Sequence, residues 1–209
     1  MVGITLFGDS ICNGYGVSLC DTWSVKLSNH LKLVYDNKVR LMNSSVDGRT
    51  TRQALLDMPY HIQSHPPDVL IVQFGMNDCN YWKTDNGVQR VSPCSFEANL
   101  FEIIDRAYRF GVKYVILNTN HPTLLLEPIN EYMTYQDSNK EYNNIIRSVA
   151  NNTGTHVVLN DIEESFTAFH STRALLLPKP DLLHPSTIGH KVYFDVTQRK
   201  LEEVLHEII

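Results

Sequence analysis

The sequence predicts a three-layer α/β/α sandwich in which helices cover both faces of a five-stranded parallel sheet. Five short runs of β-branched and apolar residues alternate with segments whose apolar residues recur at helical spacing. The runs are apolar throughout instead of alternating with polar residues, which is typical of parallel strands buried on both faces. The predicted strands are residues 2–7, 39–42, 69–74, 114–118 and 156–159.

Four segments with helical spacing separate or follow these strands. The first starts after Asp21 and the second after Ser95, and both residue types can cap a helix N-terminus. The second ends at Gly111, a residue type common just beyond a helix. The third ends before Gly154, and the last begins after Ser186. No repeat or linker interrupts this alternation, so residues 1–209 are expected to form one domain.

Composition limits the classes of function. Hydrophobic residues make up 43% of the chain and charged residues 20%, and the net charge is -5 with no basic stripe, so nucleic acid is not an expected partner. No apolar run approaches the roughly 18 residues needed to span a bilayer, and no secretory leader precedes the first strand. The four cysteines lack metal-type spacing, so we expect free thiols in a cytoplasmic protein that does not contact a membrane.

The tripeptide Gly8-Asp9-Ser10 directly follows the first apolar run and carries most of the functional interpretation. By itself it is also ordinary turn chemistry. Three further blocks give it weight, because each lies after a predicted strand or before the last helix: the Asn43–Gly48 segment, Gly75-Met76-Asn77-Asp78, and Asp181-Leu182-Leu183-His184. Such positions gather at one edge of a parallel sheet, where α/β folds place their ligand crevice.

These four blocks resemble the SGNH hydrolase superfamily, also called the GDSL esterases and lipases, from Gly8 to His184. The resemblance implies a single SGNH hydrolase domain with a flavodoxin-like sheet, no cofactor, and Ser10 as nucleophile, His184 as general base and Asp181 as its orienting carboxylate. It also implies an oxyanion hole formed by the backbone N–H groups of Ser10 and Gly48 and by the side-chain amide of Asn77. One position departs from the family pattern, because Ser45 stands where the second block usually has its first glycine.

The residue types suit acyl transfer. A serine hydroxyl attacks a carbonyl only if a base within about 2.6–3.2 Å takes its proton, and His184 has a carboxylate three residues away that can fix its tautomer. The order Ser, Asp, His along the chain is one of several that serine hydrolases use. Gly48 would leave room for a backbone N–H to approach the substrate.

Other polar residues near these blocks have structural explanations. Asp9 and Asp78 are expected to accept hydrogen bonds from turn backbone. Cys12 is expected to be a small buried residue, not a nucleophile, because no second acid–histidine pair accompanies it. His61 and His65 are four residues apart but lack a third ligand nearby, so we interpret them as part of a solvated helix end and predict no metal site.

Two long loops leave the same sheet edge and are expected to shape the substrate pocket. Residues 79–95 offer aromatic surface and positive charge, and residues 120–135 contain a run of leucines that forms either an apolar wall or part of the core. We hypothesise a small acyl group against the leucines and a polar or sugar-like alcohol portion near the aromatic side chains. The candidate substrate-binding residues are Tyr81, Trp82, Arg90, His121 and Leu124.

The expected activity is hydrolysis of small or short-chain acyl esters. The substrate is a small-molecule ester, and the reaction proceeds through an acyl-enzyme intermediate. Deacetylation of an O-acetylated sugar and thioester hydrolysis remain alternatives, because all three reactions share that intermediate. A flavodoxin-like module that binds phosphate or flavin at the Gly8-Asp9-Ser10 loop is the alternative that is not an enzyme. The sequence leaves the oligomeric state open.

Overall fold

A five-stranded parallel sheet forms the centre of the computed structural model, with the strand order β2-β1-β3-β4-β5. The structure describes residues 1–81, 84, 86–130, 132–168 and 176–209. All strand pairs are parallel, and the order is that of flavodoxin-like sheets. The predicted fold class and all five strands are therefore confirmed. The strands are β1 (Val2–Gly8), β2 (Val39–Asn43), β3 (Val69–Gln73), β4 (Tyr114–Asn118) and β5 (Val157–Asn160).

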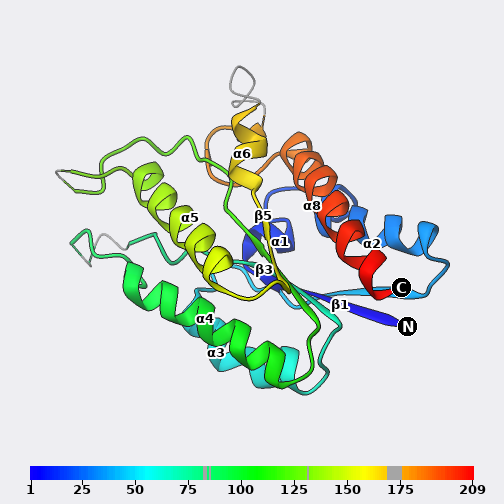
Figure 1. The fold of residues 1–209 in the computed structure, drawn as a ribbon. Helices are drawn as coiled ribbons and strands as arrows, with labels where there is room; N and C mark the ends of the chain where they lie inside the picture. Colours follow the sequence, from blue (N-terminus) through cyan, green and yellow to red (C-terminus); the bar gives the residue numbers. More distant parts are fainter. Residues whose placement is uncertain (82–83, 85, 131, 169–175) are drawn as a thin grey trace.

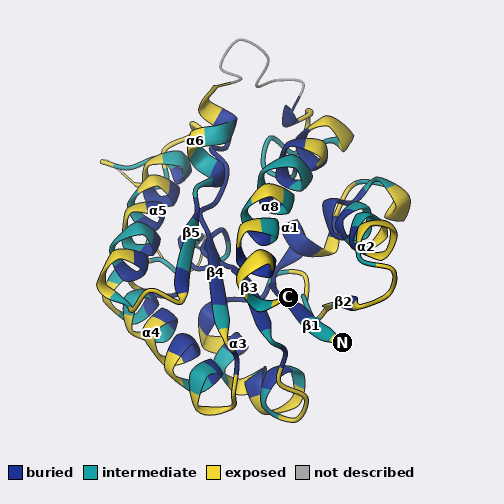
Figure 2. Cartoon of the chain, turned by 45° about the vertical axis from the view of Figure 1, so that its right-hand side comes forward, coloured by how far each residue is buried: buried dark blue, intermediate teal, exposed yellow. Residues whose placement is uncertain are grey.

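Helices cover both faces of the sheet (Figure 1). On one face, α2 (Trp23–Val34) packs against α8 (Thr187–Ile208). On the other, α4 (Pro93–Arg109) lies between α3 (Thr51–Met58) and α5 (Tyr135–Asn152). The buried side of each helix faces the strands (Figure 2), so the apolar core forms two layers around the sheet. Shorter elements are α1 (Ser10–Asn13), η1 (Leu19–Asp21), η2 (Pro59–Gln63) and α6 (Ile162–Thr167).

Two of the predicted helix caps are wrong, each by a few residues. Thr22, not Asp21, caps α2 by accepting a hydrogen bond from the Val25 N–H, because Asp21 ends the preceding 3₁₀ turn. Ser92, not Ser95, caps α4, and Pro93 then occupies the first helical position, where its missing N–H costs nothing. Ser186 caps α8 as predicted.

The strand register brings the functional blocks to one edge. Gly8 of β1 pairs with Gln73 of β3, so the two strands end at the same level. Ser10 leaves β1 there, and the Asn77 turn leaves β3 beside it. All five residues of β3 are buried, which fixes the central strand of this edge in the core.

Buried side-chain amides of Gln73 and Asn120 form hydrogen bonds at this edge of the sheet. The side chain of Asn120, after β4, accepts a hydrogen bond from Gln73 at 2.7 Å and donates to the Phe74 carbonyl at 3.1 Å. Gly75 follows with a φ of +124°, and a Cβ there would lie 2.3 Å from the Asn120 amide nitrogen. Only glycine fits, so the turn that carries Asn77 has a fixed path.

Candidate active site

Ser10 is the first residue of the short helix α1. The Asp9 carboxylate caps this helix by accepting the Ile11 N–H at 3.0 Å, as expected of an acid at a strand exit. Gly14 ends the helix with a φ of +84°, where a Cβ would collide with Thr22. Ser10 is buried, with only 7% of the residue exposed, so its hydroxyl has a defined direction.

A chain of hydrogen bonds joins the three sequence-predicted residues. The Ser10 Oγ lies 2.9 Å from His184 Nε2, and His184 Nδ1 lies 2.7 Å from Asp181 Oδ2. The serine and the histidine are 174 positions apart in sequence. Both distances are within the range for proton transfer between heavy atoms, so the arrangement can deprotonate the serine as it attacks.

The carboxylate of Asp181 is fixed by its own loop. Its Oδ1 accepts the N–H groups of Leu183 and His184, each at 3.1 Å, and Leu182, between Asp181 and Leu183, adopts a φ of +61°. Burial works against ionisation, but the hydrogen bonds from His184 and from the loop backbone outweigh it and lower the pKa of Asp181. The carboxylate is therefore charged and can hold the imidazole with its Nδ1–H toward the acid.

The sequence did not point to Tyr15, which lies against the imidazole. Its ring centroid is 4.5 Å from that of His184, and the side chain is 54% exposed. The Tyr15 N–H also donates to the Ser10 carbonyl at 3.1 Å. Its position one residue after Gly14 is the available signal, since the glycine that ends α1 reverses the chain and the Tyr15 ring then lies against His184.

The second block approaches Ser10 from the side of β2. Asn43 donates its side-chain amide to the Cys12 carbonyl at 3.1 Å and accepts the Ser45 N–H at 3.1 Å. Ser45 is not among the residues with a left-handed backbone, so serine is accommodated where the family pattern has glycine. Gly48 adopts a backbone conformation that favours glycine, and the predicted close approach of a substrate stays a prediction. Nothing lies within 4 Å of a Cβ there, and the requirement is the φ of +74°.

A buried arginine that sequence reasoning missed holds this loop. Arg49 is 2% exposed, donates to the Ser44 carbonyl at 2.7 Å and pairs with Asp57 at 3.1 Å. Its guanidinium also lies over the Phe7 ring. Burial lowers the pKa of Arg49 from its ordinary value. Arg49 thus ties Gly48 to α3 and to the core.

Asn77 lies between the side chains of Asp9 and Arg90. Its Nδ2 donates to Asp9 Oδ2 at 3.2 Å, and its Oδ1 accepts from Arg90 Nη1 at 3.4 Å. Asp9 is fully buried, and burial raises its pKa to about 7. Asp78 accepts both the N–H and the hydroxyl of Thr51, and burial raises its pKa to about 6. Both acids therefore make the structural contacts expected of them, and Asp9 also contacts Asn77.

The predicted substrate-binding residues have different surroundings. His121 is fully buried, and its contact with a substrate stays a prediction. Burial lowers its pKa to about 3, and the neutral ring bonds the Tyr193 hydroxyl and the Leu183 carbonyl, both at 2.7 Å. The contact with the Leu183 carbonyl joins His121 to the Asp181–His184 loop. Leu124 packs on the core and donates its N–H to the Leu182 carbonyl, while Trp82 lies outside the described residues.

Tyr81 lines a cleft of about 640 Å³ between the two long loops, together with Asn86, Asn130 and Tyr132. None of the described lining residues is charged. Each loop starts at the candidate site: the first leaves the Asn77 turn, and the second is joined to the loop of Asp181 through Leu124. The described residues that line the cleft include none of Ser10, Asn77, Asp181 and His184, so the loops, and not the cleft lining itself, connect it to the candidate site.

Comparison with known proteins gives the family. Residues 6–192 match the model of the GDSL-like Lipase/Acylhydrolase family. The chain belongs to this family. The match confirms the resemblance that the four sequence blocks indicate, and it includes every predicted member of the Ser10–His184–Asp181 group.

Curated relatives cover part of the chain. An arylesterase of Vibrio mimicus is 26% identical over 119 residues, which are 57% of this chain and 55% of the relative. Thioesterase 1/protease 1/lysophospholipase L1 of Escherichia coli K12 is 27% identical over 101 residues, 48% of this chain and 43% of the relative. The chain thus spans about half the length of the curated relatives it matches.

Solved structures share the fold over nearly the whole chain. The acetylxylan esterase Axe2 of Geobacillus stearothermophilus superposes with a TM-score of 0.78 at 21% identity, covering 95% of this chain and 93% of Axe2. The acetylxylan esterase AlAXEase gives 0.77 at 23% identity, with 95% and 99% coverage. Within the described part of the chain, no helix is both long and apolar enough to cross a membrane.

Proposed function

We propose that the chain is a carboxylic ester hydrolase in which Ser10 is the nucleophile, His184 the general base and Asp181 the residue that orients the histidine. The observation that carries the proposal is the continuous chain of contacts from Ser10 Oγ to His184 Nε2 at 2.9 Å and from His184 Nδ1 to Asp181 Oδ2 at 2.7 Å. A site that only held a phosphate or a flavin would gain nothing from an acid-oriented imidazole aimed at a serine.

The reaction follows from these contacts. Ser10 Oγ attacks the ester carbonyl while His184 Nε2 takes its proton, and the tetrahedral intermediate collapses as the imidazolium returns that proton to the departing alcohol. Water then attacks the acyl-enzyme by the same route, so that one ester and one water give one acid and one alcohol. Asp181, charged throughout, stabilises the imidazolium in both steps.

The negative charge on the carbonyl oxygen requires donors that are already in place. We assign this role to the backbone N–H groups of Ser10 and Gly48 and to Asn77 Nδ2. The left-handed turn at Gly48, held by Arg49, and the fixed turn after Gly75 support the assignment, because both loops have a defined path toward Ser10. Loss of one such donor typically lowers turnover about 10²- to 10³-fold.

Substitution of the nucleophile tests the proposal. Ser10→Ala should reduce hydrolysis of p-nitrophenyl acetate by several orders of magnitude without changing the thermal unfolding midpoint, leaving only the oxyanion and binding contributions. A fluorophosphonate probe should label the wild-type protein on Ser10, located by peptide mass spectrometry, and should not label the variant. Full activity of Ser10→Ala, or labelling at another residue, would contradict the assignment.

We propose O-acetylated sugars as the substrate class, with a short acyl group. The cleft carries Tyr81 and Tyr132 together with Asn86 and Asn130 among its described lining residues, and this favours the class, because aromatic faces and amides suit a sugar ring better than a fatty chain or a phosphate. Two structural neighbours bear the name acetylxylan esterase, which is consistent with this choice. The catalytic residues would equally accept a thioester.

Substrate series separate these options. We expect acetyl esters to be hydrolysed faster than octanoyl esters, and acetylated xylo-oligosaccharides faster than acetyl-coenzyme A. Tyr132→Ala should lower kcat/KM for the oligosaccharide several-fold and leave p-nitrophenyl acetate unchanged, since Tyr132 is 90% exposed and lines only the cleft. A preference for long acyl chains or for the thioester would rule out the acetylated sugar.

We further propose the cytoplasm as the compartment. All four cysteines are free, and Cys20 and Cys94 are exposed, which suits a reducing environment. Cell fractionation followed by immunodetection tests this, and recovery of the protein outside the cytoplasmic fraction would contradict it.

A further inference from the structure

The side chain of Asn77 can donate to an oxyanion in only one of its two amide orientations. The oxygen and nitrogen ends of the amide have nearly the same size, so packing alone does not choose between them. If the amide turned by 180°, it would present a lone pair where negative charge develops, and a stabilising contact would become a repulsive one. Something in the site must therefore select the orientation.

Two neighbours of opposite character make that selection. Arg90 can only donate, and its Nη1 lies 3.4 Å from Asn77 Oδ1. Asp9 accepts through its Oδ2, which lies 3.2 Å from Asn77 Nδ2. The nitrogen carries two hydrogens, and this pair of contacts uses one of them. Flipping the amide would place its oxygen against a carboxylate and its N–H groups against a guanidinium.

Both neighbours are fixed by the surrounding backbone. The Arg90 N–H donates to the Asn80 carbonyl at 2.7 Å, and the Val91 N–H donates to the Asp78 carbonyl at 3.2 Å, so the loop of Arg90 returns to the turn that carries Asn77. Asp9 is held by its cap on Ile11. The sequence places Arg90 thirteen residues beyond Asn77, on a loop where positive charge suggested substrate binding.

We infer that Arg90 is a positioning residue, which acts with Asp9 to hold the Asn77 amide with its N–H directed at the oxyanion. The inference rests on the proposed function of Asn77 as an oxyanion donor. It assigns to Arg90 an effect on turnover that passes through Asn77, and no direct contact with the substrate.

A double-mutant cycle between Arg90 and Asn77 tests the inference. Arg90→Met removes the donor and keeps the length of the side chain, and we expect kcat for p-nitrophenyl acetate to fall about tenfold with KM nearly unchanged, less than the loss of a whole oxyanion donor. Arg90→Lys should recover part of the loss. In the Asn77→Ala background, Arg90→Met should cause no further loss, because the group on which it acts is absent.

A matched control and a second variant keep the test decisive. Arg109→Met removes an exposed arginine at the far end of α4 and should leave kcat unchanged. Asp9→Asn keeps an oxygen for the Ile11 cap but turns a donor toward Asn77, so it should also lower kcat in a way that Asn77→Ala abolishes. If Arg90→Met fails to fold, this variant and Arg90→Lys carry the cycle.

The outcomes separate this inference from the proposed function. An active Ser10→Ala would remove the proposed function. An inactive Ser10→Ala together with additive losses for Arg90→Met and Asn77→Ala, or a loss confined to KM, would overturn the role of Arg90 alone. A non-additive loss in kcat supports it.

Discussion

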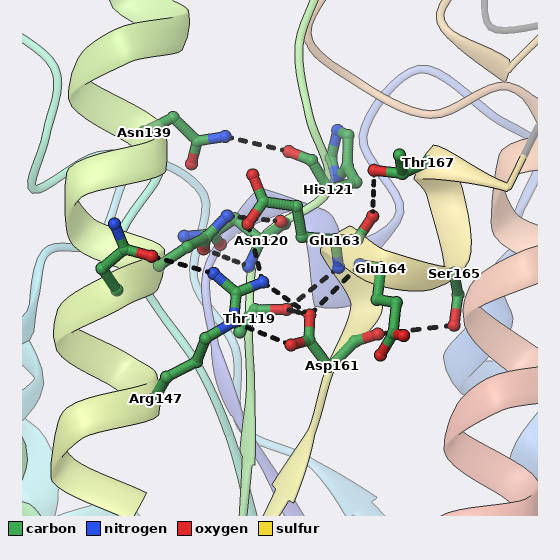
Figure 3. A network of polar contacts seen from close by, with 12 residues as sticks. Thr119, Asn120, His121, Asn139, Arg147, Asp161, Glu163, Glu164, Ser165 and Thr167 are labelled. Carbon is green, nitrogen blue, oxygen red and sulfur yellow. Dashed lines mark hydrogen bonds and ion pairs between the residues drawn. The ribbon is translucent and has the colours of Figure 1, made fainter. Parts of the chain in front are cut away.

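Two pairs of an aspartate and a basic side chain lie at the same edge of the sheet, Asp161 with Arg147 and Asp181 with His184. Their hydrogen bonding is similar, but only the second pair can transfer a proton. Asp161, after β5, accepts Arg147 through both carboxylate oxygens, at 2.7 and 2.8 Å, and also binds Thr119 and the Glu164 N–H (Figure 3). Asp181 accepts two backbone N–H groups and one imidazole N–H. In both, hydrogen bonds overcome the effect of burial and lower the pKa of the acid.

The difference lies in where each chain of contacts ends. Arg147 also donates to a second acid, Glu163, at 2.8 Å and to the Asn144 side chain at 3.2 Å, and a guanidinium does not release a proton in a protein. The network of Arg147 therefore joins α5 to the start of α6 and contains no group that would take a proton from Ser10. His184 can lose and gain a proton, and its second nitrogen faces Ser10. Under the proposed function, a partly buried carboxylate thus becomes part of a catalytic group through its partner, and not through its own environment.

The largest expected effect sharpens this comparison by removing one charge from each pair. Asp181→Asn should lower kcat by on the order of 10⁴-fold, because the amide no longer enforces the tautomer of His184 or stabilises the imidazolium. Asp161→Asn is the matched change and should retain activity per folded molecule. Steady-state hydrolysis of p-nitrophenyl acetate measures both, and an Asp181→Asn variant with more than a tenth of wild-type kcat would place the two acids in one class.

The sequence predicts the parts of this site that depend on short segments. Ser10, Asn77, Asp181 and His184 each follow a strand or precede a helix, so the parallel sheet alone brings them to one edge. The sequence does not predict contacts between side chains of distant loops. The charge of Arg90 suggests substrate binding. In the structure its loop returns to Asn80, and the guanidinium lies against Asn77 instead.

His121 and Gly48 show two further limits of sequence reasoning. His121 follows a strand as the catalytic residues do, but Tyr193, from α8, and Leu183 enclose it, and neither is near it in sequence. Gly48 is identifiable as a required glycine, whereas the reason for it, a left-handed φ in open space, depends on the path of the loop.

The second expected effect compares Asp9 with Asp181, two acids whose pKa values move in opposite directions. Burial raises the pKa of Asp9 to about 7 from 3.8, so the folded protein binds a proton there that the unfolded chain has already lost between these pH values. Stability contributed by this group is present below about pH 4 and is lost as the pH rises through 7. The full effect is roughly 4 kcal/mol at about 1.4 kcal/mol per pKa unit.

Asp9→Asn removes this titration. The free energy of unfolding of the variant minus that of the wild type, from urea unfolding, should therefore increase from pH 4 to about pH 7 and level off above it. The same variant should lose activity through Asn77, so a gain in stability accompanies a loss of function. A difference in unfolding free energy that does not change with pH would show that Asp9 titrates at its ordinary pKa.

The third expected effect concerns the network of Arg147. Arg147→Met leaves Asp161 and Glu163 without their cation. Because the Arg147–Asp161 ion pair is only about three-quarters buried, the free energy of unfolding should fall by about 2 kcal/mol, less than for a fully buried pair. For a chain of this size that corresponds to a decrease in Tm of roughly 4–8 °C. Calorimetry measures it, with the exposed pair of Arg109 as a control that should change Tm little. Activity below the transition should remain, and its loss would join this network to the catalytic site.

The smallest expected effect uses two glycines with the same backbone requirement in different parts of the molecule. Gly48 has a φ of +74° near Ser10, and Gly111 has a φ of +93° after α4, and a Cβ would meet no atom within 4 Å at either position. Alanine at each should therefore cost only the left-handed backbone penalty, about 1–2 kcal/mol. The two variants should have similar unfolding free energies, while only Gly48→Ala should lower kcat, because strain there moves a proposed oxyanion donor. Equal kcat values for the two variants would remove Gly48 from the oxyanion hole and leave its glycine explained by the turn alone.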